Sequence, residues 1–431
     1  MKALSEREAT FAIAAARVAT PGQLLRDGFV VVGGGSVLEV GQGPPPAALT
    51  VVDLGDVLVA PGFVDLHVHG GGGAQVNCPT REEVAASVWR MARFHARHGT
   101  TAMVATTVSD SPEALQTAVE GVALMSRGEA VPSPEAVVDG VTEATAPGEP
   151  GAVVLGCNLE GPWIARSRAG AQFPDALRLP SVAELDDLVD RGKGTVRIVT
   201  LAPELEGAME VIAAARSAGV VVSIGHTDTD YATARKAFDA GARHATHLFN
   251  AMAPIHHRRP GPVAAALVDD RVSLEIIADG VHIHPALISL VATLAPERLV
   301  LVTDAIGATG TPPGRHRLGP LEVLVQDGRA VLAGHQETAA GSVLTMDRAV
   351  ALTVQVAGVP LLTALQAASL HPANVLGEQR KGRLAPGADA DLVVLDNDLA
   401  LVGTVVGGQV AHDPLGVLAP LEMTASRARL P

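Results

Sequence analysis

The chain has 431 residues, of which 48% are hydrophobic, 18% charged and only 2% aromatic, and its formal net charge is −14. This composition supplies a large aliphatic core, and an acidic balance without a basic block argues against nucleic acid as a partner. Because the sequence holds no run of about 18 uncharged apolar residues, we expect no membrane span. The two cysteines, Cys78 and Cys157, form neither a disulfide framework nor a zinc-type pair, so we expect a cytoplasmic protein.

Both ends of the chain are predicted to be rich in β-structure. Glycine and proline turns separate short apolar runs near the N-terminus, and the last part of the chain has the same pattern. The expected strands are 11–19, 28–33, 36–41, 50–53, 57–60, 390–396 and 401–410. We predict one small β-sandwich domain assembled from residues 1–59 and 381–431.

The middle of the chain alternates apolar strand-like runs with helical patterns. The expected strands are 64–69, 101–108, 153–159, 196–202, 220–226, 244–249, 272–277 and 299–303, and clear helical patterns occupy 81–98, 112–125, 205–218 and 231–240. Eight such alternations predict an α/β fold with a (β/α)8 TIM-like barrel over residues 60–380, because buried parallel strands are near-continuous apolar runs. Residues 131–150, rich in proline, glycine and acidic residues, are expected to form an exposed insertion.

Six of the eight predicted strands end in a histidine or an acid, or lead into one. His67 and His69 are spaced i, i+2, so both side chains point to the same face of a strand and can reach one metal ion. The other strand-end positions are Glu160, His226, His247, His282 and Asp304. Chemistry in such barrels lies at the carboxyl ends of the strands, which makes this set a candidate active site. His244, three residues before His247, is expected to point to the opposite face.

These motifs resemble the amidohydrolase superfamily and, within it, the N-acetylglucosamine-6-phosphate deacetylases. The matching pieces are Asp65-Leu66-His67-Val68-His69-Gly70, Leu159-Glu160-Gly161-Pro162, Gly225-His226-Thr227, Thr246-His247-Leu248-Phe249-Asn250-Ala251-Met252, Ala278-Asp279-Gly280-Val281-His282, Thr303-Asp304-Ala305 and Gly387-Ala388-Asp389-Ala390-Asp391-Leu392. The resemblance covers essentially the whole chain. It implies a hydrolase that removes the N-acetyl group of an amino-sugar phosphate and releases acetate.

The resemblance also implies roles for the strand-end residues. Glu160, His226 and His247 would bind a divalent metal, and this donor set suits zinc or iron(II). His67 and His69 would hold a second ion bridged by Glu160, so one or two ions per subunit are expected. Asp304 would be the general base and acid that moves the proton from water to the departing amine.

Substrate contacts are expected at six positions. His282 would bind hydroxyls or phosphate, Arg258 is similar to the family's phosphate-binding arginine, and the backbone amides of Asn250 and Ala251 would add phosphate donors. Ala171 and Gln172 match a substrate-contacting loop. The resemblance implies a homodimer in which Arg258 reaches into the neighbouring subunit's site.

Several alternatives remain open at this stage. The substrate could be N-acetylgalactosamine 6-phosphate or another N-acyl compound, because the orientation of one hydroxyl depends on loop geometry. A different amidohydrolase, such as an adenine deaminase or a cyclic-amide hydrolase, should show other strand-end signatures. A non-catalytic scaffold should have lost metal ligands or the Asp304 carboxylate, and none is lost in this sequence.

Overall fold

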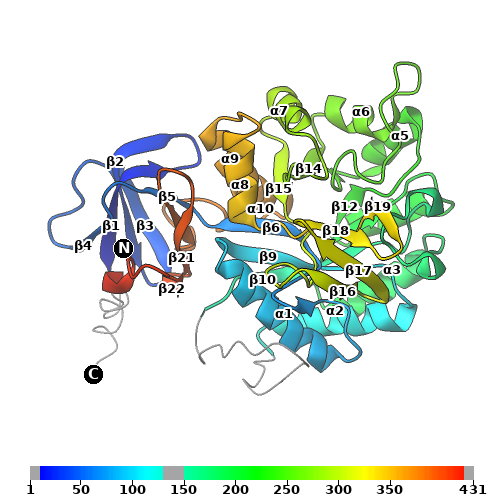
Figure 1. Cartoon of the computed structure of the whole chain (residues 1–431), viewed down its shortest axis with the longest axis horizontal. Coiled ribbons are helices and arrows are strands. Elements are labelled where there is room, and N and C mark those ends of the chain that lie inside the picture. The colour runs from blue at the N-terminus through cyan, green and yellow to red at the C-terminus, as the bar shows by residue number, and fades with distance from the viewer. Residues whose placement is uncertain (1–9, 130–149, 422–431) are drawn as a thin grey trace.

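The computed structural model of the chain describes residues 10–129 and 150–421. Figure 1 shows two parts side by side: a small β-sheet that contains strands from both ends of the chain, and a larger barrel of strands and helices built from the middle. The insertion predicted at 131–150 lies outside the described residues, apart from Pro150.

A parallel sheet of eight strands forms the barrel, as the sequence predicts. The strands follow one another in the order β15-β14-β13-β12-β11-β10-β9-β6, and every pairing is parallel. They are β6 (Phe63–Val68), β9 (Thr100–Thr107), β10 (Val153–Glu160), β11 (Val196–Leu201), β12 (Val221–Ile224), β13 (His244–Ala245), β14 (Ser273–Ile277) and β15 (Leu299–Val302). The two ends meet where Val68 bridges Ala305 and the Asp304 amide donates to the His67 carbonyl at 2.9 Å. The predicted α/β barrel is therefore confirmed.

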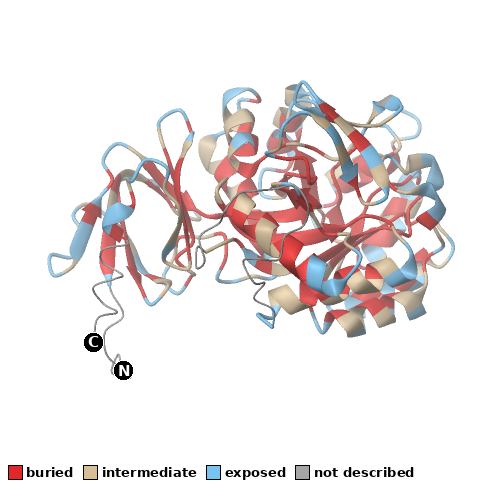
Figure 2. Cartoon of the chain, turned by 60° about the horizontal axis from the view of Figure 1, so that its bottom comes forward, coloured by how far each residue is buried: buried red, intermediate tan, exposed pale blue. Residues whose placement is uncertain are grey.

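Helices surround this sheet, and polar caps mark where several of them begin. Thr80 and Glu83 form a reciprocal capping box at α1, and the side chain of Ser111 caps α2 just before a proline. The helices are α1 (Arg81–Ala96), α2 (Pro112–Ser126), α3 (Val182–Gly192), α4 (Ala208–Ser217), α5 (Tyr231–Ala240), α6 (Gly261–Val268), α7 (Pro285–Leu294), α8 (Met346–Gln355), α9 (Leu361–Ala368) and α10 (Leu370–Val375), with short 3₁₀ turns at Arg166–Arg168 and Pro174–Ala176. Figure 2 shows buried strands inside and helices with exposed outer faces. Within the described ranges, no helix is long and apolar enough to cross a membrane.

The smaller sheet curves around its own apolar core. It contains β1 (Phe11–Ala19), β2 (Leu24–Gly33), β3 (Ser36–Gln42), β4 (Thr50–Asp53), β5 (Leu58–Pro61), β20 (Leu392–Leu395), β21 (Leu401–Val406) and β22 (Gln409–His412). The first half of β1 pairs with β4 and its second half with β5, while β20 from the far end of the chain pairs with β5. An additional β-sheet domain built from both ends is thus present. The predicted boundaries after residues 59 and 380 stay predictions.

A four-stranded antiparallel sheet, which the sequence analysis missed, lies between β15 and α8. We call β16 (Gly314–Leu318), β17 (Leu321–Gln326), β18 (Arg329–Leu332) and β19 (His335–Ala339) the lid sheet. Its apolar face packs on Val108, Ile306 and Ala308 at the end of the barrel. Alternating apolar residues around the two-residue turn Asp327-Gly328, both with positive φ, were the signal for a hairpin here.

Candidate active site

The chain leaves several barrel strands with a sharp change of backbone direction. His226, His247 and Asp304 have φ values of 47°, 28° and 50°, in the left-handed region that side chains other than glycine rarely occupy. Such strained positions cluster at functional sites, where the surrounding structure holds them. The turn that contains His247 starts so early that β13 has only two residues. The alternation of side chains along a strand, from which His244 and His247 were expected to point to opposite faces, therefore does not apply.

The first group of side chains combines Glu160 with two histidines. Glu160 Oε1 lies 2.9 Å from His247 Nε2 and 3.1 Å from His226 Nε2, and these two ring nitrogens are 3.1 Å apart. All three residues are at most 5% exposed. A carboxylate oxygen and two imidazole nitrogens therefore converge on one point below the rim of the barrel.

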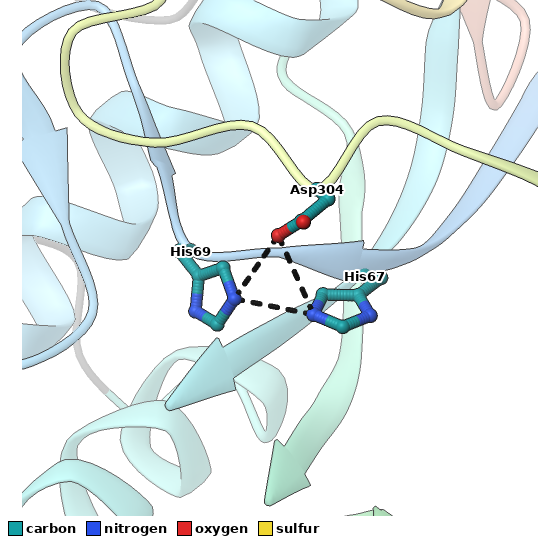
Figure 3. A group of neighbouring side chains, drawn as sticks. All are labelled: His67, His69 and Asp304. Atoms are coloured by element: carbon teal, nitrogen blue, oxygen red, sulfur yellow. Dashed lines mark hydrogen bonds and ion pairs between the residues drawn. The ribbon is translucent and has the colours of Figure 1, made fainter. Parts of the chain in front are cut away.

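The second group consists of His67, His69 and Asp304. Figure 3 shows the three side chains pointing toward one another, the two histidines from β6 and its end and the aspartate from the loop after β15. The Nε2 atoms of the histidines are 3.1 Å apart, and Asp304 Oδ1 lies 3.2 Å from His69 Nε2. Glu160 adjoins this group as well, because its Oε2 is 3.2 Å from His69 Nε2. One carboxylate thus stands between two clusters of ligand-type residues.

The histidine rings are held so that Nε2 faces the cluster. The Nδ1 atom of His226 lies 2.8 Å from the Arg168 carbonyl and that of His69 lies 3.1 Å from the Thr106 carbonyl. Nδ1 of His67 lies 2.7 Å from Glu275 Oε1. Because each acceptor fixes a hydrogen on Nδ1, the Nε2 atom of a neutral ring carries a lone pair, which is how metal-binding histidines are oriented. Facing lone pairs about 3 Å apart need a cation between them, so the residues present fit divalent metal ions.

Burial and mutual charge shift the pKa values of these groups. Burial alone would lower the pKa of His69, but hydrogen bonds and charge from Asp304 and Glu160 raise it to about 9. Burial would raise the pKa of Glu160, yet the charges of His67 and His226 and two histidine hydrogen bonds hold it well below its usual range. The carboxylate is therefore ionised, and imidazolium protons balance its charge when no metal does.

A cavity of about 280 Å³ opens over both groups, and most of the predicted substrate residues line it. The lid sheet supplies one wall through Leu318, Thr338 and Ala339. Among the predicted contacts, His282, Asn250, Ala251, Ala171 and Gln172 lie on the wall. His282 Nδ1 is 2.6 Å from Asp279; burial would lower the pKa of His282, but this carboxylate raises it. Gln172 donates to Glu160 Oε2 at 2.5 Å and accepts from the Ser109 amide at 2.6 Å, so its side chain braces the shared carboxylate.

One detail differs from the sequence prediction. The backbone amide of Asn250 donates to the His247 carbonyl at 2.9 Å, so it is engaged rather than free to bind phosphate. Arg258 is exposed on a loop whose ends, His256 and Arg259, form a bridge, and it does not line the cavity of its own chain. The tight turn after His247 explains the difference at Asn250. Arg258 is predicted to act in the neighbouring subunit's site, so its position outside the cavity of its own chain is no departure from that prediction, which stays a prediction.

Sequence reasoning missed Glu275, which sits in the middle of β14. Its side chain contacts His67 through Oε1 and lies 2.8 Å from His244 Nε2 through Oε2. His244 therefore reaches the site through this carboxylate and does not point away from it. A glutamate inside the apolar run Leu274-Glu275-Ile276-Ile277 was the available signal, because a buried charge needs partners.

A model of the amidohydrolase family matches residues 58–411. The chain belongs to the amidohydrolase family. An N-acetylglucosamine-6-phosphate deacetylase from Bos taurus is 40% identical over 367 residues, which is 83% of this chain and 84% of the relative. An N-acetylgalactosamine-6-phosphate deacetylase from Escherichia coli is 37% identical over 367 residues, which is 85% of this chain and 91% of the relative.

Solved structures of this amidohydrolase type have the same architecture. A variant of the N-acetyl-D-glucosamine-6-phosphate deacetylase from Mycobacterium smegmatis, in complex with N-acetyl-D-glucosamine-6-phosphate, superposes with a TM-score of 0.84 at 40% identity and covers 94% of this chain and 99% of its own. The N-acetylglucosamine-6-phosphate deacetylase from Thermotoga maritima gives a TM-score of 0.79 at 29% identity and covers 94% and 100%. The resemblance drawn from the motifs is confirmed.

Proposed function

We propose that this chain hydrolyses the N-acetyl group of N-acetyl-D-glucosamine 6-phosphate to glucosamine 6-phosphate and acetate. The observation that carries the proposal is the position of Glu160, 2.9 Å from His247 Nε2 through Oε1 and 3.2 Å from His69 Nε2 through Oε2, with Asp304 beside it at the cavity. The relatives named as deacetylases of this sugar phosphate support the choice of substrate.

The proposed cofactor is a pair of zinc or iron(II) ions. Glu160, His226 and His247 would hold one ion, and His67, His69 and Asp304 the other, with Glu160 shared. Nitrogen and oxygen donors of this kind suit both metals. A divalent ion in such a site lowers the pKa of a water and polarises an amide carbonyl.

Asp304 is the proposed proton carrier. Its carboxylate accepts a proton from the water as the water oxygen attacks the acetyl carbon. It then returns that proton to the amide nitrogen as the carbon–nitrogen bond breaks, which yields acetate and a free amine. Residues of the lid sheet and of the barrel rim together line the cavity in which this step takes place.

The phosphate of the substrate needs cationic partners. His282 meets this need inside the chain, because Asp279 raises its pKa and so favours the imidazolium form. In the proposed assembly, Arg258 of a neighbouring subunit would supply the second cation; the residue is exposed and lies outside the cavity of its own chain. A guanidinium can bind phosphate through two parallel hydrogen bonds.

A homodimer is therefore part of the proposal. Its support is the stretch from residue 255 to 294, where large apolar side chains are exposed: Ile255 50%, Val268 60%, Val281 42%, Leu290 44% and Leu294 58%. Association of two chains through this stretch would remove these side chains from water. Light scattering of the purified protein should give twice the mass of the chain, and a monomer at micromolar concentration would contradict this part.

We also infer a cytoplasmic location. The proposed substrate is a phosphorylated sugar, and both cysteines are free thiols, Cys157 buried and Cys78 half-buried. Free thiols are typical of reducing compartments. Fractionation of the native host should recover the protein with cytoplasmic enzymes, and recovery in an envelope fraction would overturn the inference.

N-acetylgalactosamine 6-phosphate is the second candidate substrate, because a relative named for that activity is 37% identical. Metal dependence is tested by measuring acetate release from N-acetylglucosamine 6-phosphate before and after metal removal. We expect the rate to fall on chelation and to return with zinc or iron(II). An unchanged rate after complete metal removal would contradict the proposed mechanism.

A further inference from the structure

The histidines of the two clusters are not held alike. The Nδ1 atoms of His69 and His226 each form a hydrogen bond with a backbone carbonyl. The buried Nδ1 of His247 has no hydrogen-bond partner among the described residues. His67 alone has a side chain as the acceptor of its Nδ1, the Glu275 carboxylate at 2.7 Å. The orientation of His67 in the His67, His69 and Asp304 cluster therefore depends on the Glu275 side chain, which a single substitution can change.

The Glu275 carboxylate is itself rigidly held. Oε2 lies 2.8 Å from His244 Nε2, while Oε1 accepts from His67 and, at 3.2 Å, from the backbone amide of His247. Glu275 is 1% exposed and His244 is fully buried. Since Nδ1 of His244 has no partner among the described residues, the hydrogen of that ring belongs on Nε2, where it points at Glu275. Both carboxylate oxygens are thus fixed before any ligand arrives.

We propose that Glu275 is a positioning residue that prepares the His67, His69 and Asp304 cluster for a metal ion, and thereby determines whether the subunit holds one ion or two. The inference rests on the proposed metal-binding role of the two clusters. A carboxylate behind a ligand histidine fixes the ring hydrogen on Nδ1, leaves the lone pair on Nε2 toward the ion and strengthens that nitrogen as a donor.

The expected effect is selective. Glu160, His226 and His247 would keep their ion, because the Arg168 carbonyl holds the His226 ring and both rings face Glu160 Oε1. Glu275 contacts this group only at the backbone amide of His247, an interaction that a glutamine oxygen can also accept. In Glu275→Gln the amide keeps the shape of the side chain but loses its charge. When the amide nitrogen faces His67, it favours the tautomer with hydrogen on Nε2, which cannot bind a cation. Loss of such a partner typically weakens metal binding about 10- to 100-fold.

The experiment is a metal titration of the full-length protein and Glu275→Gln with zinc and with cobalt(II). Equilibrium dialysis followed by elemental analysis counts the ions per subunit, and the visible cobalt spectrum reports each coordination environment separately. Asp391→Asn is the matched control, because Asp391 is a buried carboxylate, 2% exposed, that lies just before β20 and binds Lys381 Nζ at 2.7 Å. Thermal unfolding of the metal-free forms monitors folding.

We expect the wild type and Asp391→Asn to bind two ions and Glu275→Gln to bind one tightly and the other about 10- to 100-fold more weakly. Two ions of wild-type affinity in Glu275→Gln would overturn the inference. Loss of both ions together would also overturn it, since Glu275 would then support the fold and not one metal position. Failure of the wild type to bind any ion would instead refute the metal dependence on which the inference rests.

Discussion

Asp304 Oδ1 lies 3.2 Å from His69 Nε2, although His69 directly follows β6, the first barrel strand in the chain, and Asp304 follows β15, the last. The contact exists because the barrel closes between β6 and the chain after β15. The amides of His69 and Gly70 both donate to the Ala305 carbonyl, at 2.9 Å and 2.8 Å. A side chain on Gly70 would meet the Gly307 backbone nitrogen at 2.3 Å, so only glycine permits this approach.

The first prediction concerns Asp304. Asp304→Asn keeps the size of the side chain but removes the group that accepts the proton from water. We expect kcat to fall about 10²- to 10⁴-fold, the usual contribution of general acid–base catalysis. The ion held by Glu160, His226 and His247 should remain, as elemental analysis will show. Turnover within a few-fold of the wild type would remove Asp304 from the proposed mechanism.

The second prediction tests Arg258 and the dimer together. Arg258→Ala should raise KM for the phosphorylated sugar far more than for the unphosphorylated one. If the arginine acts across subunits, a mixture of refolded Arg258→Ala and Asp304→Asn chains contains a dimer with one complete site, so activity should exceed that of either variant alone. Equal KM effects on both sugars would place Arg258 outside the site, and no gain on mixing would contradict its action across subunits.

The third prediction concerns the lid sheet. Val323 is fully buried in the core of this sheet. Val323→Ala should therefore lower the stability of the lid sheet by about 2 kcal/mol. Because Leu318 and Ala339 of this sheet line the cavity, we expect KM to rise while metal content stays unchanged. Val30→Ala removes the same atoms from the core of the smaller sheet and is the matched control. An equal rise of KM in both variants would argue against a lid role.

The fourth prediction concerns acid stability. His95 is buried, and its Nε2 donates to the Gly70 carbonyl at 2.9 Å; burial lowers its pKa from 6.5 to about 4. The unfolded chain therefore takes up a proton as the pH falls below 6.5, while the folded chain resists until about pH 4. Stability from this group is complete above pH 6.5 and falls by about 2 kcal/mol by pH 5.

His95→Gln keeps a hydrogen-bond donor but removes the titration. Urea unfolding at several pH values should therefore give a shallower loss of stability in acid for the variant than for the wild type. Parallel curves for the two proteins between pH 7 and pH 5 would show that His95 does not titrate in this way. The comparison isolates one residue, because all other titrating groups are common to both proteins.

The sequence predicted the site correctly where a histidine or an acid stands at the end of a predicted barrel strand. His67, Glu160, His226 and Asp304 each follow an apolar run, and parallel topology brings such ends to one rim. The orientation of His244 could not be read from alternation, because left-handed backbone at His247 ends the strand early. Glu275 was hidden inside an apolar run, and its role depends on which strands become neighbours across the barrel.

Loop residues were the hardest to place from the sequence. Gln172 faces Glu160 because the loop after β10 folds back over the rim, which no local pattern encodes. The lid sheet had a readable hairpin signal at Asp327-Gly328, but its packing on Ile306 is a long-range contact.

The central claim is tested most directly by acetate release from three substrates with the metal-loaded protein: N-acetylglucosamine 6-phosphate, its galacto epimer and unphosphorylated N-acetylglucosamine. We expect kcat/KM to be highest for the first and lowest for the sugar without phosphate. A higher value for the galacto epimer would move the substrate to the second candidate. No acetate from any of the three, with metal bound, would contradict the proposed deacetylase function.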